Sequence, residues 1–215
     1  MKGGVIMRKE ILIMTKSAKI NGFCVAGIDI HNGKWIRLVS DNNEEGEGAV
    51  LRKDLLYKDY SEAQIFDIIE VNGHNSPTDA QRENFIYYGQ WNKIGTGSLQ
   101  EVISKYGYSS HRFILGNTSA TLDESELTGE SLSLVIINNI TIDVYINKRG
   151  KIKHKINFTC NGSKYNGIYL SDIQLKDQFN KVGLYNIEGQ HYAVFSITGK
   201  FETTGLYYKM LAKLF

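Results

Sequence analysis

The chain has 215 residues, and 42% of them are hydrophobic, which is enough to bury the core of one large domain or two small ones. It carries 25 Lys and Arg against 23 Asp and Glu, a balance that by itself indicates no class of partner. The longest apolar run of the basic N-terminal segment covers residues 11–14, too short for a membrane span or a signal peptide. We therefore expect a cytoplasmic protein without a membrane partner, with Cys24 and Cys160 as buried thiols.

Short strands separated by turns are predicted for the first half of the chain. The candidate strands are residues 10–15, 23–30, 34–40, 65–72 and 112–116. Between the second and the third, Asn32-Gly33 predicts a two-residue type I′ turn. Residues 41–50 predict an acidic, glycine-rich loop, and residues 76–84, which hold the only proline, predict an ordered turn.

A helix near 98–106 is predicted by the spacing of Ser98 and Glu101. The Ser98 hydroxyl can accept a hydrogen bond from the third helical amide, while Glu101 reaches back, as in a capping box. Apolar side chains then recur on one helical face, and Gly107 predicts the end of the helix.

The second half has the element order of an OB-fold. The pattern predicts strands at 131–147, 151–160 and 163–170, a short helix at 171–181, and strands at 191–201 and 206–215. This order of three strands, a helix and two strands is expected of a small Greek-key barrel. We therefore predict a mostly β fold of two small OB-fold-like β-barrels with short connecting helices, the first over residues 7–130 and the second over residues 131–215.

Positive charge is concentrated in the predicted second barrel. Residues 1–130 hold 14 Lys and Arg against 18 Asp and Glu, whereas residues 131–215 hold 11 against 5. A basic barrel can bind nucleic acid, although a solvated lysine face gives the same count.

The densest basic stretch comprises Lys148, Arg149, Lys151, Lys153 and Lys155. Gly150 predicts a turn, after which the three later lysines share one strand face about 7 Å apart. That row can follow a phosphate backbone, and Tyr165 and Tyr169 on the next strand can add stacking surfaces. The alternative is that the lysines protect an edge strand from aggregation.

Trp35 and Arg37 form a second candidate nucleic-acid site. They alternate along one strand, and with the predicted turn Ile30 faces Trp35 and Ile28 faces Arg37. An aromatic ring beside a guanidinium can stack a base and pair a phosphate. The alternative places Trp35 over the barrel core and Arg37 against a carboxylate such as Asp29 or Asp67.

Three segments resemble a known family. Residues 15–40, "TKSAKINGFCVAGIDIHNGKWIRLVS", resemble the opening of bacterial dual OB-containing domain proteins, in which a basic segment precedes this hairpin. "SPTDAQREN" and "LYYKMLAKLF" resemble a later segment and the terminal strand of the family. The resemblance extends from about residue 7 to the end. It implies two OB-fold-like barrels, a nucleic-acid-binding or accessory role in bacterial defence-type systems, and no established catalytic residue.

The sequence thus predicts a non-catalytic module that binds single-stranded DNA or RNA. No metal-ligand spacing, catalytic motif or cofactor fingerprint is present, so we expect no enzyme, no metal and no cofactor. The alternative is a protein-interaction or sensor module within a larger complex, with the lysines acting for solubility. A small-molecule pocket in either barrel, the choice between DNA and RNA, the protein partner and the oligomeric state stay open.

Overall fold

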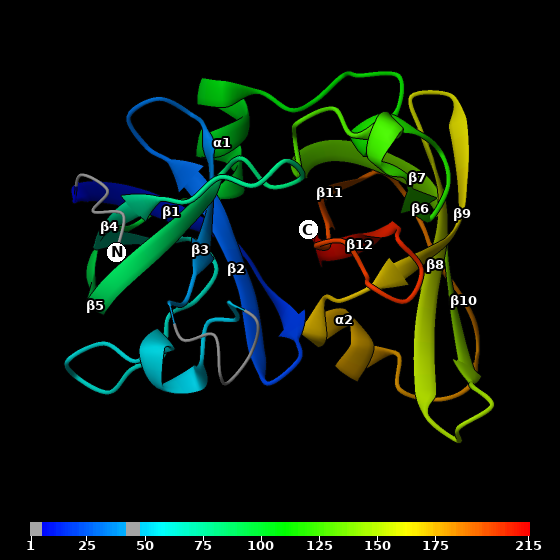
Figure 1. Ribbon diagram of the computed structural model, residues 1–215. Helices are drawn as coiled ribbons and strands as arrows, with labels where there is room; N and C mark the ends of the chain where they lie inside the picture. The colour runs from blue at the N-terminus through cyan, green and yellow to red at the C-terminus, as the bar shows by residue number, and fades with distance from the viewer. Residues whose placement is uncertain (1–5, 42–47) are drawn as a thin grey trace. The chain divides into compact units, whose positions relative to one another are not determined.

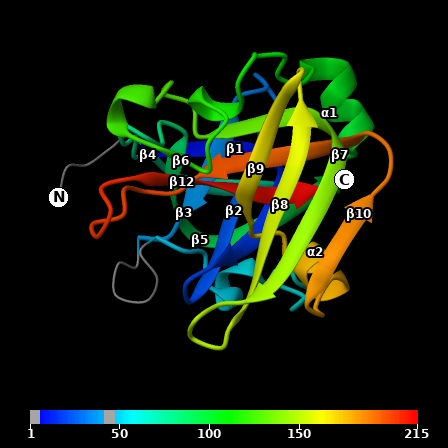
Figure 2. The same ribbon diagram turned by 90° about the vertical axis from the view of Figure 1, so that its right-hand side faces the viewer.

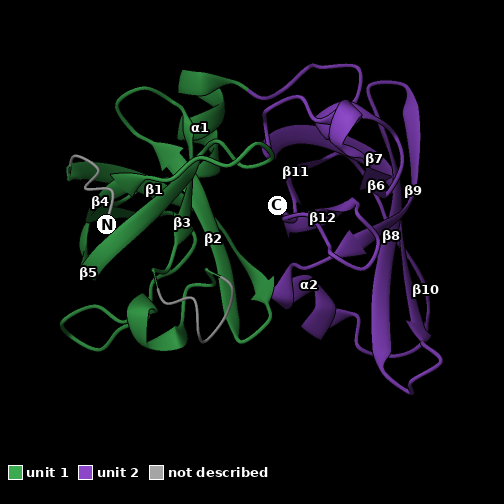
Figure 3. Ribbon diagram, in the orientation of Figure 1, with its two compact units in different colours: residues 1–107 green, residues 108–215 purple. Residues whose placement is uncertain are grey.

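The computed structural model describes residues 6–41 and 48–215 (Figure 1). Within these ranges the chain is mostly β, with two α-helices and three short 3-10 helices. It divides into two compact units, residues 1–107 and 108–215 (Figure 3). Each unit contains one closed five-stranded barrel, so the predicted fold class is confirmed. Residues 42–47 of the predicted acidic loop lie outside the described residues.

Unit 1 is a five-stranded barrel. Its strands are β1 (Met7–Lys19), β2 (Gly22–Asp29), β3 (Trp35–Val39), β4 (Asp67–Asn75) and β5 (Asn84–Thr96). They close in the order β1-β2-β3-β5-β4, with β4 returning to β1. The β3–β5 pairing is parallel and the other pairings are antiparallel. The 3-10 helix η1 (Arg52–Leu55) lies in the connection between β3 and β4.

The core of unit 1 follows from the period of two in its strands. Alternate side chains such as Ile11 and Ile13 of β1 point inward and pack around Trp91. A Cβ atom at Gly27 of β2 would lie 2.1 Å from the Leu12 carbonyl oxygen. The two strands therefore approach so closely that only glycine fits at this position.

The predicted helix is confirmed as α1 (Leu99–Tyr106). The Glu101 amide donates to the Ser98 hydroxyl at 3.2 Å, and Gly107 ends the helix with a φ of +75°. The Lys105 ammonium (2.9 Å) and the Tyr106 hydroxyl both donate to the Ile30 carbonyl, which anchors the helix to the β2–β3 connection.

That β2–β3 connection is longer than the sequence predicts. The Asp29 amide donates to the Lys34 carbonyl at 2.9 Å, so residues 30–33 form the loop and the predicted two-residue turn is wrong. The Asp29 carboxylate accepts hydrogen bonds from the His31 amide and the Asn32 side chain. Within this loop only Gly33 takes a positive φ, at +73°, whereas the predicted type I′ turn would need a positive φ at Asn32 as well.

Unit 2 repeats the strand order of unit 1. Its barrel strands are β7 (Leu132–Ile146), β8 (Ile152–Cys160), β9 (Ser163–Leu170), β11 (His191–Ile197) and β12 (Tyr207–Leu214). They close in the order β7-β8-β9-β12-β11, and β11 pairs with β7. The β9–β12 pairing is parallel, like β3–β5. The predicted helix between the third and fourth barrel strands is α2 (Ile173–Gln178), and β10 (Gly183–Ile187) pairs with β7.

Residues 108–130 belong to unit 2, whereas the sequence placed the division at residue 130. This segment holds η2 (Ile114–Gly116), β6 (Thr121–Leu122) and η3 (Glu124–Glu126), and β6 pairs with β12. The strand predicted at residues 112–116 is wrong, because η2 forms there and Leu115 has a φ of +51°. With this division residues 1–107 hold 13 Lys and Arg against 14 Asp and Glu, and residues 108–215 hold 12 against 9. The difference in net charge between the two units is therefore smaller than the predicted boundary at residue 130 indicated.

Candidate functional site

The densest group of exposed cations lies on unit 2, in the β7–β8 turn and on β8. We call Lys148, Arg149, Lys151, Lys153 and Lys155 the lysine surface. The Asn147 side-chain oxygen accepts hydrogen bonds from the amides of Arg149 and Lys151, at 2.9 and 3.0 Å, and Gly150 has a φ of +71°. The turn is thus fixed by its own hydrogen bonds, and it presents its basic side chains to solvent.

The predicted alternation of β8 holds from Lys153 to Ile156, whereas Ile152, which was predicted to face inward, is 49% exposed. His154 and Ile156 are buried, whereas Lys153 is exposed and Lys155 half-buried. Among the described residues no carboxylate pairs with any cation of the lysine surface. Asp143 of β7 lies opposite Lys155 in the strand register without forming an ion pair with it. The cations are therefore available to an external anion.

The two tyrosines predicted for this site lie on opposite faces of β9. Tyr169 is half-buried on the outer face, and the Lys155 ammonium lies 5.4 Å from its ring centroid. Tyr165 is 0% exposed, stacks on Phe158 at 4.9 Å, and its hydroxyl accepts from the Ile114 amide. We therefore assign Tyr165 to the core and keep Tyr169 on the surface.

A β-bulge separates these tyrosines. Ile156 pairs with Ile168, but Phe158 pairs with Tyr165, so β9 has one more residue than β8 between the two pairs. Gly167 has a φ of +68° at this point. The extra residue reverses the inward and outward alternation of side chains along β9. Tyr165 and Tyr169 are four positions apart, and they therefore point to opposite faces.

Two further aromatic residues lie next to Tyr169, and the sequence reasoning missed both. Tyr208 of β12 contacts the Tyr169 ring at 5.6 Å, and Phe201, in the β11–β12 loop, contacts the Tyr208 ring at 4.8 Å. The position of Phe201 in the chain could have indicated it, because OB-folds use the loop between their last two strands for binding.

Two further lysines of unit 2, Lys209 and Lys213, have structural roles. Lys209 is 0% exposed, and its ammonium donates to the backbone and side-chain oxygens of Asn117. Burial lowers the pKa of Lys209 to about 8, although the Glu126 carboxylate acts in the opposite direction. Lys213 pairs with Asp172, the N-cap of α2, at 3.2 Å. These side chains hold residues 114–126 and α2 in place and add nothing to an external surface.

Arg37 of unit 1 is in the core rather than on an open face. Its side chain is 7% exposed, its Nε donates to the Glu83 carboxylate at 3.1 Å, and its guanidinium donates to the Cys24 sulfur at 2.9 Å. Its backbone amide also donates to the Glu83 carbonyl. The expected carboxylate partner exists, but it is Glu83 and not Asp29 or Asp67.

Trp35 is half-buried at the start of β3, opposite Ile28, and Arg37 lies opposite Ala26. The predicted pairing was shifted by two residues because it assumed the shorter turn. Residues 25–29 of β2 and 36–38 of β3 are all buried, so both sets of alternating side chains are covered. Trp35 and Arg37 therefore belong to the barrel of unit 1, whereas the lysine surface belongs to the barrel of unit 2. The predicted site residues do not all lie on one barrel.

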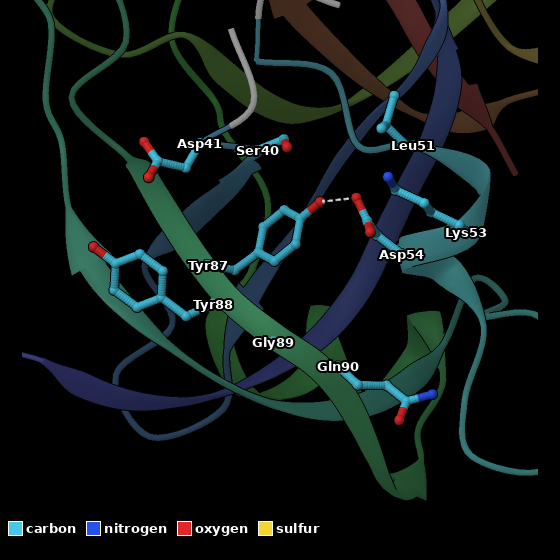
Figure 4. Close-up of a pocket in the computed structure, with 9 residues that line it drawn as sticks. All are labelled: Ser40, Asp41, Leu51, Lys53, Asp54, Tyr87, Tyr88, Gly89 and Gln90. Carbon is cyan, nitrogen blue, oxygen red and sulfur yellow. Dashed lines mark hydrogen bonds between the residues drawn. The ribbon is translucent and has the colours of Figure 1, made fainter. Parts of the chain in front are cut away.

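Unit 1 also has a pocket of about 510 Å³ beside η1 (Figure 4). The Tyr87 hydroxyl donates to the Asp54 carboxylate at 2.7 Å, and burial together with this bond raises the pKa of Tyr87. Among its lining residues, Asp41 and Asp54 face one lysine, Lys53. Because two carboxylates outnumber the one ammonium, this pocket is poorly suited to bind a polyanion such as nucleic acid.

No metal or membrane feature accompanies these sites. Across residues 6–41 and 48–215, no group of three or more His, Cys, Asp or Glu side chains is placed to hold a metal ion. The described helices are all too short or too polar to cross a bilayer. Both cysteines are free thiols, and burial raises the pKa of Cys160 to about 11.

Two barrels that share one strand order, each with its third strand parallel to its fifth, place the chain among OB-fold proteins, a class of binding modules. The chain belongs to the dual OB-containing domain family, whose model matches residues 9–214. Neither the curated proteins nor the solved structures contain a match to this chain. The family predicted from the hairpin motif is therefore confirmed.

Proposed function

We propose that this chain is a non-catalytic module that binds single-stranded DNA or RNA through the lysine surface of unit 2. One observation carries the proposal. Five cations extend from the β7–β8 turn onto the outer face of β8, and no carboxylate within residues 6–41 and 48–215 pairs with them. In OB-folds, the second and third strands and the loop joining the first two strands form the surface that binds oligonucleotides.

The spacing of the cations suits a phosphate backbone. Alternate residues of a strand are about 6.5 Å apart, so Lys153 and Lys155 can contact successive phosphates. Such contacts release condensed counterions, which supplies affinity that does not depend on base sequence. The helix α2 has six residues and its N-cap Asp172 is buried, so it offers no recognition helix for a duplex groove.

The test is fluorescence anisotropy of labelled single-stranded DNA and RNA, titrated with the intact chain. We expect binding at low salt that weakens about 15- to 250-fold between about 50 and about 200 mM salt, since a few phosphate contacts give a logarithmic slope of about −2 to −4. Absence of binding to both polymers at low salt would contradict the proposal, as would an affinity that salt leaves unchanged.

A protein-interaction or sensor role is the second candidate. Four apolar side chains beside the same turn are well exposed: Ile146 (59%), Ile152 (49%), Val182 (58%) and Leu184 (68%). They lie on or next to the neighbouring strands β7, β8 and β10, and an apolar interface there would be insensitive to salt. The role in bacterial defence-type systems implied by the family resemblance stays a prediction.

A further inference from the structure

The β11–β12 loop of unit 2 holds an exposed aromatic ring in a fixed position. Phe201 is 46% exposed, although the loop around it is closed by hydrogen bonds. Its amide donates to the Leu206 carbonyl at 3.0 Å, and its carbonyl accepts from the Gly205 amide at 2.7 Å. The Thr198 hydroxyl accepts from the Tyr208 amide at the base of the loop. The ring is thus preorganised, so holding it in place on binding costs little entropy.

This ring is the end of a continuous row that begins in the lysine surface. Lys155 lies over Tyr169, Tyr169 contacts Tyr208, and Tyr208 contacts Phe201, with interplanar angles of 71° and 69° for the two aromatic contacts. The row crosses β8, β9 and β12 on the outer face of the barrel. Figure 2 shows β8 and β9 side by side, with β12 passing behind them and the red loop before β12 projecting at the left.

The two ends of the row have different chemistry. Cations at the β7–β8 turn attract phosphates, whereas exposed aromatic rings at the β11–β12 loop stack on the flat faces of bases. A duplex offers its phosphates but keeps its base faces stacked within the helix. Only a strand with unpaired bases can therefore use both ends of the row.

We propose that Phe201 is a base-stacking residue and that Tyr208 and Tyr169 continue the stacking surface toward the lysines. The inference rests on the proposed function, and it adds that the ligand is held through its bases as well as through its phosphates. Phe201 supplies affinity through the base and not through the phosphate. Loss of the ring should then affect only ligands that carry bases.

The experiment compares a short oligothymidine with an abasic strand of the same length, by anisotropy at low salt. The intact chain should bind oligothymidine more tightly than the abasic strand. Phe201→Ala should weaken oligothymidine binding about 5- to 100-fold, the range of one lost stacking contact, and leave abasic binding unchanged. Phe201→Trp should keep the affinity. Because the ring is exposed, unfolding curves should confirm that both variants keep the stability of the parent chain.

The outcomes separate the two proposals. Equal binding of both strands by the intact chain, or full oligothymidine affinity in Phe201→Ala, would overturn the stacking role while salt-sensitive binding still supports the phosphate contacts. Failure to bind either strand would overturn the proposed function and this inference with it. A second readout is 2-aminopurine placed in the strand, whose fluorescence should change less on binding to Phe201→Ala than on binding to the intact chain.

Discussion

Reversing three charges of the lysine surface, in the variant Lys151→Glu/Lys153→Glu/Lys155→Glu, is expected to weaken single-strand binding about 100-fold or more at low salt. Each substitution replaces an attraction to phosphate by a repulsion. Each phosphate contact adds about 0.7 to the slope of log affinity against log salt, so losing three contacts should reduce the slope by about 2. The measurement is anisotropy over a series of salt concentrations, for the parent chain and the variant.

A matched control separates the local surface from the total charge. Lys58→Glu/Lys176→Glu/Lys181→Glu changes the net charge equally but leaves the β7–β8 turn and β8 intact. We expect this control to keep most of the affinity. An equal loss in both triple variants would mean that the protein attracts nucleic acid only through its overall charge, and the lysine surface would lose its assigned role.

The second large effect concerns stability and lies in unit 1. Arg37→Leu is expected to lower the free energy of unfolding by about 3–5 kcal/mol, because it removes the buried guanidinium that pairs with the Glu83 carboxylate, whose side chain is only 10% exposed. Urea unfolding of the variant and the parent chain measures this loss. Lys34→Met, an exposed change in the same hairpin, is the control and should alter stability by less than about 0.5 kcal/mol.

A double variant tests the physical reason. Arg37→Leu/Glu83→Leu removes both charges, so it should recover a large part of the stability that Arg37→Leu loses. If Arg37→Leu unfolds at the same urea concentration as the parent, the ion pair contributes nothing to stability. Other contacts would then hold β3 against the segment that contains Glu83.

The elements of the fold could be predicted because their signals are local. Period-two alternation identified the outer lysines of β8, and the spacing of Ser98 and Glu101 identified α1. The boundary of unit 2 depended instead on contacts between residues far apart in sequence, such as β6 with β12. No local pattern in residues 108–130 indicates that pairing.

The candidate site was only partly predictable for the same reason. Tyr165 and Tyr169 should share a face by simple alternation, and a single extra residue in β9 places Tyr165 in the core. Arg37 meets a carboxylate 46 residues away, which spacing cannot indicate. Phe201 enters the site because the barrel brings the β11–β12 loop beside Tyr208, whereas the sequence pattern predicted it as the last residue of a strand that ends at Ile197 in the structure.

The two barrels share a topology but not an open face. In unit 1 the second and third strands are buried on both sides over residues 25–29 and 36–38, whereas in unit 2 the outer face of β8 carries accessible lysines. Strand order alone therefore does not locate a binding surface. Our proposal places it on unit 2 because of the charge and exposure of the outward side chains there.

The most direct measurement is a photo-crosslinking map. A single strand containing 5-iodouracil is bound to the intact chain, irradiated and digested, and the crosslinked peptides are identified by mass spectrometry. Our account predicts crosslinks at Tyr169, Tyr208 and Phe201, whose rings form the row beside the lysine surface. Crosslinks confined to residues 1–107 would contradict it and would place the nucleic-acid site on the other barrel.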